Sequence, residues 1–166
     1  MVVPQIPFLV ETADLLKDDW QKTGVQLNIV TMAVDDINKE ILRTRNYQML
    51  LFGNILNNNP DVFAFWHSSE RFYPGLNLSS YNSREADRLL EKIRQEINPE
   101  QRKADMSRLQ SIINQDTPAI FLFNPNYIYI APNNLYGFNL SFAATTANRF
   151  DKISQWHLKI GRQFAK

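Results

Sequence analysis

The sequence predicts an α/β fold in which a mixed sheet is flanked by helices. Strand-like and helix-like segments alternate along the 166 residues, with no repeat, linker or low-complexity tract. Residues 47–52 are a continuous apolar run of strand length, which is typical of a strand covered on both faces. The composition, 44% hydrophobic and 12% aromatic, is sufficient for one sizeable core. We therefore expect one α/β unit over residues 1–166, without an internal boundary.

The first third of the chain predicts a strand, a helix, a second strand, a second helix and the central strand of the sheet. The helix ends at Gly24, a common residue after a helix. The second strand shows apolar residues at the two-residue period of a strand, and Asp35 or Asp36 can cap the helix that follows. The expected elements are residues 1–5, 12–23, 25–32, 35–45 and 47–52.

The rest of the chain predicts two amphipathic helices followed by two strands and a turn. Asn82 or Ser83 can cap the first of these helices, and Asp87 lies in its first turn, where the helix dipole favours a carboxylate without any catalytic role. Asn98 caps the next helix and Pro99 occupies its first position. The expected elements are helices 83–97 and 99–115, strands 119–123 and 127–131, and a turn at 132–134.

Composition and charge exclude several classes of function. The net charge of +1 gives no electrostatic basis for binding nucleic acid. No apolar run approaches the roughly 20 residues of a membrane span, and MVVPQIPFLV lacks the features of a signal peptide. The absence of cysteine excludes disulfides, thiolate catalysis and zinc-thiolate sites.

No motif for catalysis, cofactor binding or metal binding stands out. His67 and His157 each lie beside a tryptophan and lack a second ligand at the spacing that zinc sites use. The glycine-rich phosphate loops GxGxxG and GxxxxGK[ST] and the nucleophile motif GxSxG do not occur. The carboxylates lie mostly on helix faces, where a solvated surface explains them. We predict a protein that is not an enzyme and has no cofactor and no metal.

Four segments in sequence order resemble the C-terminal lobe of the family 5 extracellular solute-binding proteins. These are the dipeptide-, oligopeptide- and nickel-binding components of ABC importers. The segments are DLLKDDWQKTGVQLNIV, YQMLLFGNILNNNPDVFAFWHSS, GLNLSSYNSREADRLLEKIR and RKADMSRLQSIINQDTPAIFLF. The most specific part is the succession G-x-N, Y-N and A-D-x-L-L, followed by a helix and D-T-P-A-I-F-L.

The resemblance implies one lobe of a periplasmic-binding-protein-like (type II) fold, belonging to a longer, two-lobed protein. Its implied partners are a small solute, the N-terminal lobe of the same protein and the ABC permease subunits. The implied location of the full-length protein is the periplasm or the cell surface, secreted or lipid-anchored. The resemblance also implies that Asn77, Tyr81, Asn82 and Asp87 brace the lobe and do not contact ligand.

The predicted ligand site is the loop of residues 53–59. Ligands of open α/β sheets bind beyond the carboxyl ends of the strands, and in the resembled family the loop after this strand contacts ligand. Phe8 and Trp66 are the expected apolar walls. The predicted ligand-binding residues are Phe8, Gly53, Asn54, Leu56, Asn57, Asn58 and Trp66. An ordinary surface loop is the alternative explanation of the asparagines.

Peptide-binding members of this family bind the charged ends of a peptide with an acidic and a basic side chain. This sequence has neither at the matching positions. Those proteins place an aspartate in this loop for the peptide's amino terminus, whereas residues 54–57 read NILN. Dipeptide-binding members also use an arginine after the first strand, whereas PQIPFLVE has no base. Neutral amides suit a neutral or polyhydroxylated solute, or the middle of a longer peptide.

Two functions from different classes fit the sequence. The first is a solute-binding component of an importer, and the second is a solute-sensing or protein-interaction domain that reuses this lobe without transport. An enzyme is a third and weaker reading, because it requires a carboxylate or histidine cluster that the sequence does not show.

Overall fold

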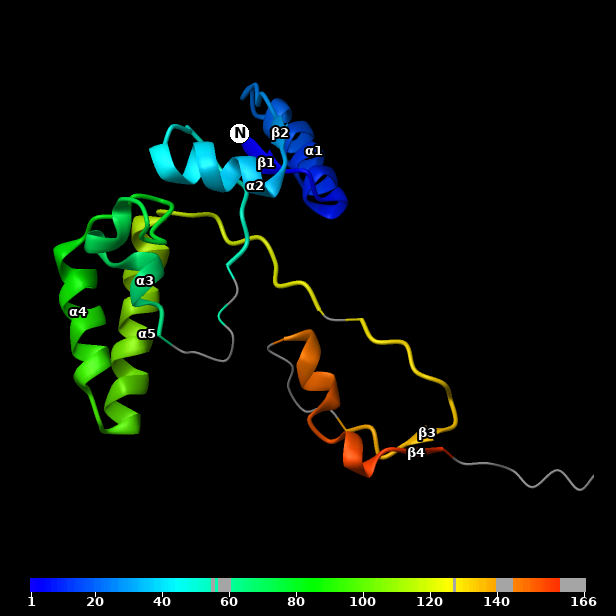
Figure 1. Ribbon diagram of the computed structural model, residues 1–166. Coiled ribbons are helices and arrows are strands. Elements are labelled where there is room, and N and C mark those ends of the chain that lie inside the picture. The colour runs from blue at the N-terminus through cyan, green and yellow to red at the C-terminus, as the bar shows by residue number, and fades with distance from the viewer. Residues whose placement is uncertain (55, 57–60, 127, 140–144, 159–166) are drawn as a thin grey trace, which may run out of the picture. The chain divides into compact units, whose positions relative to one another are not determined.

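The computed structural model describes residues 1–54, 56, 61–126, 128–139 and 145–158. Contacts between residues divide the chain into two compact units (Figure 1). The first unit is Met1–Ile55 with Pro60–Ile120, and the second is Leu56–Asn59 with Phe121–Lys166. We expected no internal boundary, and the assignment of residues 1–166 to a single lobe stays a prediction.

The first unit consists of a small parallel sheet with its helices and a group of helices that follows it. Its elements are β1 (Val2–Pro4), α1 (Pro7–Lys22), β2 (Val30–Met32), α2 (Val34–Asp36), the π-helical η1 (Ile37–Leu42), α3 (Phe63–Trp66), the 3₁₀ helix η2 (Ser68–Arg71), α4 (Arg84–Gln95) and α5 (Pro99–Asp116).

β1 is the central strand of the parallel sheet. It pairs with β2 on one side, with Val2 opposite Val30. On its other side, the Val2 N–H donates to the Met49 carbonyl and the Leu51 N–H donates to the Val2 carbonyl, both at 2.9 Å. The prediction that residues 47–52 form the central strand is therefore wrong. Among the described residues this run makes only an isolated parallel bridge at the edge of the sheet.

α1 begins five residues before the predicted start, because Pro7 occupies its first position and pre-sets the helical φ angle. Ala13 on α1 is fully buried and forms a small core with Val3 and Leu51. The predicted helix over residues 35–45 is present as α2 and η1. Asp35 and Asp36 lie in its first turn and do not cap it, since no side chain makes a cap hydrogen bond there.

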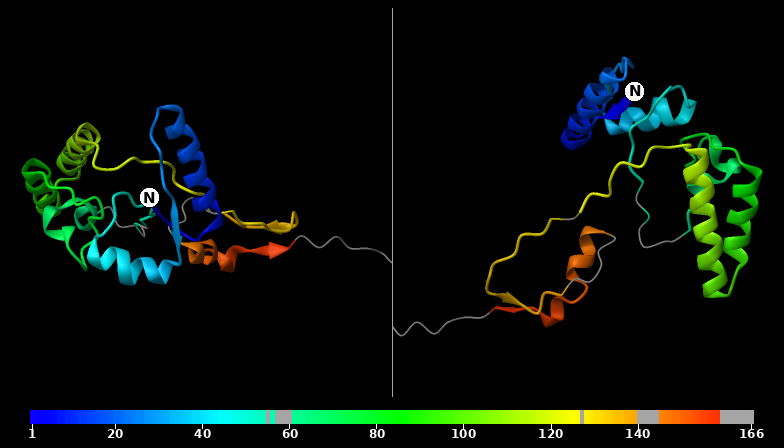
Figure 2. Two further views of the ribbon diagram at one scale, coloured as in Figure 1. Left: turned by 90° about the horizontal axis from the view of Figure 1, so that it is seen from above. Right: turned by 180° about the vertical axis from the view of Figure 1, so that it is seen from behind.

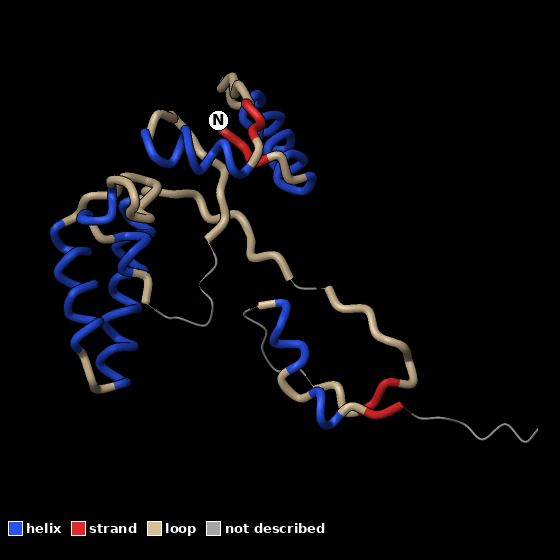
Figure 3. The backbone as a smooth tube through the Cα atoms, viewed as in Figure 1, coloured by secondary structure: helices blue, strands red, loops and turns tan. Residues whose placement is uncertain are grey.

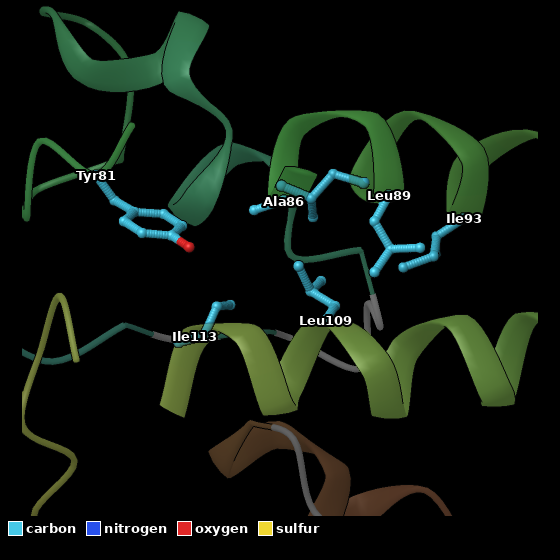
Figure 4. Packing of buried hydrophobic residues seen from close by; sticks show 7 residues of the cluster. Tyr81, Ala86, Leu89, Ile93, Leu109 and Ile113 are labelled. Atoms are coloured by element: carbon cyan, nitrogen blue, oxygen red, sulfur yellow. The ribbon is translucent and has the colours of Figure 1, made fainter. Parts of the chain in front are cut away.

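α4 and α5 run side by side and form the larger core of the first unit (Figure 2). Both agree with the predicted helices to within two residues. Apolar side chains of α4 and α5 point toward one another in Figure 4, with the ring of Tyr81 at one end. The buried residues of this core are Tyr81, Ala86, Leu89, Leu90, Ile93, Leu109 and Ile113.

The caps of α4 and α5 come from the side chains that precede them. Ser83 Oγ accepts a hydrogen bond from the Ala86 N–H at 3.5 Å, which makes Ser83 and not Asn82 the cap of α4. Asn98 Oδ1 accepts from the N–H groups of Glu100 and Gln101 at 3.0 and 3.2 Å. Local side-chain caps therefore fix the start of both helices.

The second unit contains a two-stranded antiparallel pair and two short 3₁₀ helices. Its elements are β3 (Leu135–Tyr136), η3 (Thr146–Phe150), η4 (Ile153–Gln155) and β4 (His157–Leu158). The predicted turn at 132–134 is confirmed, since the Leu135 N–H donates to the Pro132 carbonyl at 3.0 Å. The aromatic rings of Tyr129, Phe138, Phe150 and Trp156 pack together.

The predicted strands at 119–123 and 127–131 are not formed in the described residues. Residues 119–126 and 128–131 have no strand assignment and are drawn as loop in Figure 3. A strand requires a neighbouring strand for its backbone hydrogen bonds, and the sequence pattern by itself does not provide one. The described helices include none that is long and apolar enough to span a membrane.

Candidate functional site

The carboxyl edge of the parallel sheet brings three loops together. β1, β2 and residues 49–51 run in the same direction, so their carboxyl ends lie at one edge. There the chain enters α1 through residues 5–6, enters α2 through Ala33, and leaves the third segment through residues 52–54. The Gln5 N–H donates to the Met32 carbonyl at 2.8 Å, which joins the first two of these ends. This edge is the position at which open α/β sheets bind ligands.

Three of the predicted ligand-binding residues follow strands that end at this edge. Phe8 lies in the first turn of α1 and is 47% exposed. Gly53 and Asn54 begin the third loop, and both are exposed. A side chain added at Gly53 would meet nothing within 4 Å, so the space beside this residue is open. The three residues give the edge an apolar ring, an accessible backbone and a neutral amide.

The other predicted residues are not placed at the edge. Asn57 and Asn58 lie outside the described residues. Leu56 is 46% exposed and is grouped with the second unit. Trp66 ends α3, and its ring packs edge-on against Tyr81 with the centroids 6.2 Å apart. These contacts give Trp66 a packing role in the α4–α5 core.

Asp35, which the sequence predicts only as a possible helix cap, also lies at this edge. It lies in the first turn of α2, directly after β2, and is exposed. The neighbouring Asp36 shares this turn, and residues 5–8, 33–34 and 52–54 carry no charge. The signal in the sequence was its position just after a predicted strand. The edge therefore offers a carboxylate to an amine and no cation to a carboxylate.

Arg45 and Tyr47 connect the start of the third segment to the loop before α4. Arg45 Nε donates to the Arg71 carbonyl at 3.0 Å, and another nitrogen of its guanidinium donates to the Gly75 carbonyl. The Tyr47 hydroxyl donates to the Leu78 carbonyl. Burial of the Tyr47 ring raises the pKa of its hydroxyl, while Arg45 acts in the opposite direction. These hydrogen bonds attach residues 45–47 to the loop before α4. They thereby fix the start of the segment that ends at Gly53.

The residues predicted to brace the lobe do so in three of four cases. Asn77 is fully buried and hydrogen-bonded to backbone groups. Asp87 accepts hydrogen bonds from the Ser68 N–H at 2.9 Å and the Ser68 hydroxyl at 2.6 Å, which joins α4 to η2. The Tyr81 hydroxyl donates to Asp116 at the end of α5. Asn82 is exposed and takes part in none of these hydrogen bonds.

His67 lies beside two carboxylates but does not form a metal site with them. Its Nε2 is 3.5 Å from Glu91 Oε1 and 3.9 Å from Asp87 Oδ1. Its ring stacks on Phe63 with the centroids 4.0 Å apart, and its Nδ1 accepts from the Ser69 N–H at 3.1 Å. The part of the chain that the structure describes contains no group of three or more His, Cys, Asp or Glu arranged to hold a metal ion.

The chain is similar in sequence and in structure to known solute-binding proteins. No protein-family model matches the chain. Over 93 residues it is 29% identical to the oligopeptide-binding protein AppA of Bacillus subtilis (strain 168), a match that covers 56% of this chain and 17% of AppA.

Three solved structures share the fold. AppA from Bacillus subtilis in complex with a nonapeptide matches 96% of this chain with a TM-score of 0.77 and 21% identity. NikZ from Campylobacter jejuni in complex with Ni(L-His) matches 93% with a TM-score of 0.67 and 20% identity. The ABC transporter-associated periplasmic binding protein DppA from Helicobacter pylori in complex with the peptide STSA matches 95% with a TM-score of 0.62 and 19% identity.

The chain spans less than a third of the length of these proteins, since it covers 31%, 32% and 31% of the three chains. The predicted fold class, one lobe of a periplasmic-binding-protein-like fold, is confirmed by these matches. The similarity to AppA in both sequence and structure likewise confirms the resemblance of this chain to part of a family 5 solute-binding protein.

Proposed function

We propose that the chain is one lobe of the substrate-binding component of an ABC-type importer and forms one wall of an inter-lobe ligand cleft. The observation that supports this most is the match to peptide-bound AppA over 96% of the chain with a TM-score of 0.77. The names of the similar proteins describe binding proteins and not enzymes. We expect binding without catalysis, followed by delivery of the solute to a membrane permease.

The carboxyl edge of the parallel sheet is the proposed wall of the cleft. A ligand there would lie on the open side of Gly53, beside the amide of Asn54 and the ring of Phe8. A second lobe closing over it would bury the ligand from the other side, as hinge closure does in two-lobed binding proteins. Closure would then present a distinct surface to the permease.

We propose a peptide of more than two residues, or another small solute without a free carboxylate, as the ligand. Asp35 and Asp36 in the first turn of α2 are acidic, and residues 5–8 and 52–54 carry no charge, so an amine has a partner and a carboxylate has none. The middle of a peptide requires only amide partners, which Asn54 can supply. We place the full-length protein in the periplasm or at the cell surface, together with its permease.

Isothermal titration of the full-length gene product tests this proposal. The ligands are a nonapeptide with amidated carboxyl terminus, a free dipeptide, Ni(L-His) and a disaccharide. We expect the nonapeptide to bind and Phe8→Ala to weaken its binding by about 10-fold through loss of aromatic contact. Phe72→Ala is the matched control, because Phe72 is an aromatic residue that is 73% exposed and belongs to none of the three loops of the sheet edge.

Two results would contradict the proposal. The first is a full-length product that binds none of these ligands, and the second is equal loss of affinity in the Phe8 and Phe72 variants. Uptake of labelled peptide by cells, with and without the permease genes, distinguishes transport from a sensing role. A sensor would bind the peptide without supporting its uptake.

A further inference from the structure

Four cations line an open groove between α4 and α5. Arg84, Arg88 and Lys92 belong to α4, and Arg108 belongs to α5. The groove has a volume of about 500 Å³, and its other lining residues are Glu85, Leu89 and Asp105. Four cations and two carboxylates give the lining a net charge of +2. The groove therefore attracts anionic groups.

Two of the four cations are already paired within the chain. Lys92 Nζ donates to Asp105 Oδ1 at 3.0 Å, and the Arg108 guanidinium donates to Glu85 Oε1 at 2.7 Å. These two pairs use both carboxylates of the groove. The groove thus holds no further acid for its remaining two cations.

The remaining cations, Arg84 and Arg88, are exposed, and neither forms an ion pair or a side-chain hydrogen bond with a described residue. Residues three and four apart on a helix are neighbours. Asp87, three residues after Arg84, instead accepts two hydrogen bonds from η2. Glu91, three residues after Arg88, lies 3.5 Å from His67 Nε2. The nearby carboxylates of α4 therefore contact other groups.

Both arginines occupy positions at which a helix disfavours a cation. Arg84 is the first residue of α4, at the positive end of the helix dipole. Arg88 lies four residues later, and like charges at this spacing destabilise a helix. Lys39 and Arg43 have the same spacing, but they lie toward the C-terminal end of η1, where the dipole favours cations. A local preference that is broken without compensation inside the chain is expected at functional sites.

We propose that Arg84 and Arg88 bind an acidic, extended segment of a partner protein that lies in this groove. Residues four apart on a helix are separated by about 6 Å along its axis, and residues two apart in an extended chain by about 6.6 Å. Carboxylates at every second residue of the segment can therefore each meet one arginine and accept its paired hydrogen bonds. This surface does not depend on the proposed function and contains no residue of the carboxyl edge.

A protein segment fits this surface better than an anionic membrane does. α4 also carries Glu85 and Glu91, whose side chains are 58% and 57% exposed. A lipid surface presents negative charge over a broad area, so these two carboxylates would repel it. A peptide can place its carboxylates only where the arginines lie.

Fluorescence anisotropy of a labelled octapeptide tests this surface. In the probe, glutamates alternate with serines, and in the reference peptide glutamines replace the glutamates. We expect the full-length gene product to bind the glutamate peptide at least about 10-fold more tightly than the reference at low salt. The double variant Arg84→Gln/Arg88→Gln should lose at least about 10-fold of this affinity.

Lys39→Gln/Arg43→Gln is the matched control, because it removes the same charge from two exposed residues outside the groove. Its affinity for the glutamate peptide should equal that of the unmodified protein. An equal loss in both double variants would show only a general attraction to positive charge and would overturn the proposal. Equal affinity of the unmodified protein for the two peptides would also overturn it.

Thermal unfolding without peptide tests whether the arginines serve stability instead. Arg84→Gln should raise the melting temperature by about 1–3 °C, because it removes a cation from the start of α4. A lower melting temperature would give Arg84 a structural role and contradict the proposal.

Two other occupants of the groove are distinguished by direct measurement. Vesicles of phosphatidylglycerol should not compete with the glutamate peptide any better than vesicles of phosphatidylcholine do. Competition by phosphatidylglycerol alone would assign the surface to lipid and overturn the proposal. Sedimentation velocity should show the same oligomeric state for the unmodified protein and for Arg84→Gln/Arg88→Gln. A dimer that this double variant abolishes would assign the groove to a second copy of the chain, and the proposal would be wrong.

Discussion

Asn77 and Tyr81 hold the turn before α4 through two reciprocal hydrogen bonds. Asn77 Nδ2 donates to the Tyr81 carbonyl at 2.9 Å, and Asn77 Oδ1 accepts from the Tyr81 N–H at 3.0 Å. The same Nδ2 also donates to the His67 carbonyl at 3.1 Å. Asn77 is completely buried, so these partners replace all of the water that its amide loses. The Asn77 side chain thereby supplies hydrogen bonds to backbone groups of the turn that have to be satisfied inside the protein.

We expect Asn77→Ala to destabilise the chain by about 2–4 kcal/mol, because it removes the side-chain partners of the buried Tyr81 N–H and carbonyl. Urea unfolding followed by circular dichroism measures the change. Asn82→Ala is the control, since Asn82 is exposed on the same turn and should cost no more than about 0.5 kcal/mol. Equal unfolding free energies of the two variants would show that the Asn77 bonds contribute nothing.

Asp87→Ala should cost about 1–3 kcal/mol, because the carboxylate accepts two hydrogen bonds from Ser68. Asp87→Asn keeps an acceptor oxygen and should cost less. The affinity of the full-length protein for its solute should not change in either variant. Loss of solute binding by Asp87→Asn at unchanged stability would refute the structural role. Glu85→Gln in the same turn is a control, since Glu85 makes only an exposed ion pair with Arg108.

Asp105 predicts how stability depends on pH. Its hydrogen bond from Lys92 is the main cause that lowers its pKa below the ordinary 3.8, while burial acts in the opposite direction. A carboxyl whose folded pKa is lowered adds stability above its unfolded pKa and loses it as the pH falls through the folded pKa. The stability advantage over Asp105→Asn should therefore be full at pH 6 and shrink below about pH 4.

Urea midpoints measured at several pH values from neutral to about 2.5 test this expectation for both proteins. Lys92→Met in place of Asp105→Asn should remove the larger part of this acid dependence, because Lys92 Nζ lies 2.8 Å from Asp105 Oδ2, while Gln101 and Arg108 still lower the Asp105 pKa. An advantage that stays constant across the whole range would show that the ion pair does not couple folding to protons.

Thr117→Gly should stabilise the chain by about 0.5–1 kcal/mol. Thr117 follows α5 with φ 48° and ψ 50°, a left-handed conformation that is unfavourable for a β-branched residue and accessible to glycine. The substitution removes only an exposed hydrogen bond from the Thr117 hydroxyl to the Asn114 carbonyl. Thermal unfolding of this variant and of Thr117→Asn, which also tolerates this region, measures the gain. A lower melting temperature for both would contradict it.

The sequence predicted the features that depend on neighbours along the chain and missed those that depend on distant ones. The cap at Asn98, Pro99 at the next position and the apolar spacing define α5 by themselves. By contrast, the order of the strands depends on the segments that pair with Val2, which are distant in the sequence. Residues 119–131 have the sequence pattern of strands, but their described part forms no strand. The position of a strand end predicts Gly53 as a site residue, whereas Phe8 is predicted as an apolar wall. Asp35 is predicted only as a possible helix cap, because a helix start explains an aspartate at that position.

Under the proposed function the 166-residue chain offers one wall of a cleft, so by itself it should bind free dipeptides more weakly than a millimolar Kd. A cleft protein buries roughly 70–90% of its ligand, and a single wall makes fewer contacts against the same loss of ligand motion. The described loops of the carboxyl edge also have no cation for a dipeptide carboxylate.

Isothermal titration of this chain with di- and tripeptides, sugars and nickel measures the affinity, and the full-length protein with the nonapeptide is the positive control. Micromolar binding of a free dipeptide by the 166 residues would contradict the expectation on both counts. Such affinity would require a complete site and a positive charge, and the described residues of the three loops, Phe8 and Asn54 included, do not supply them.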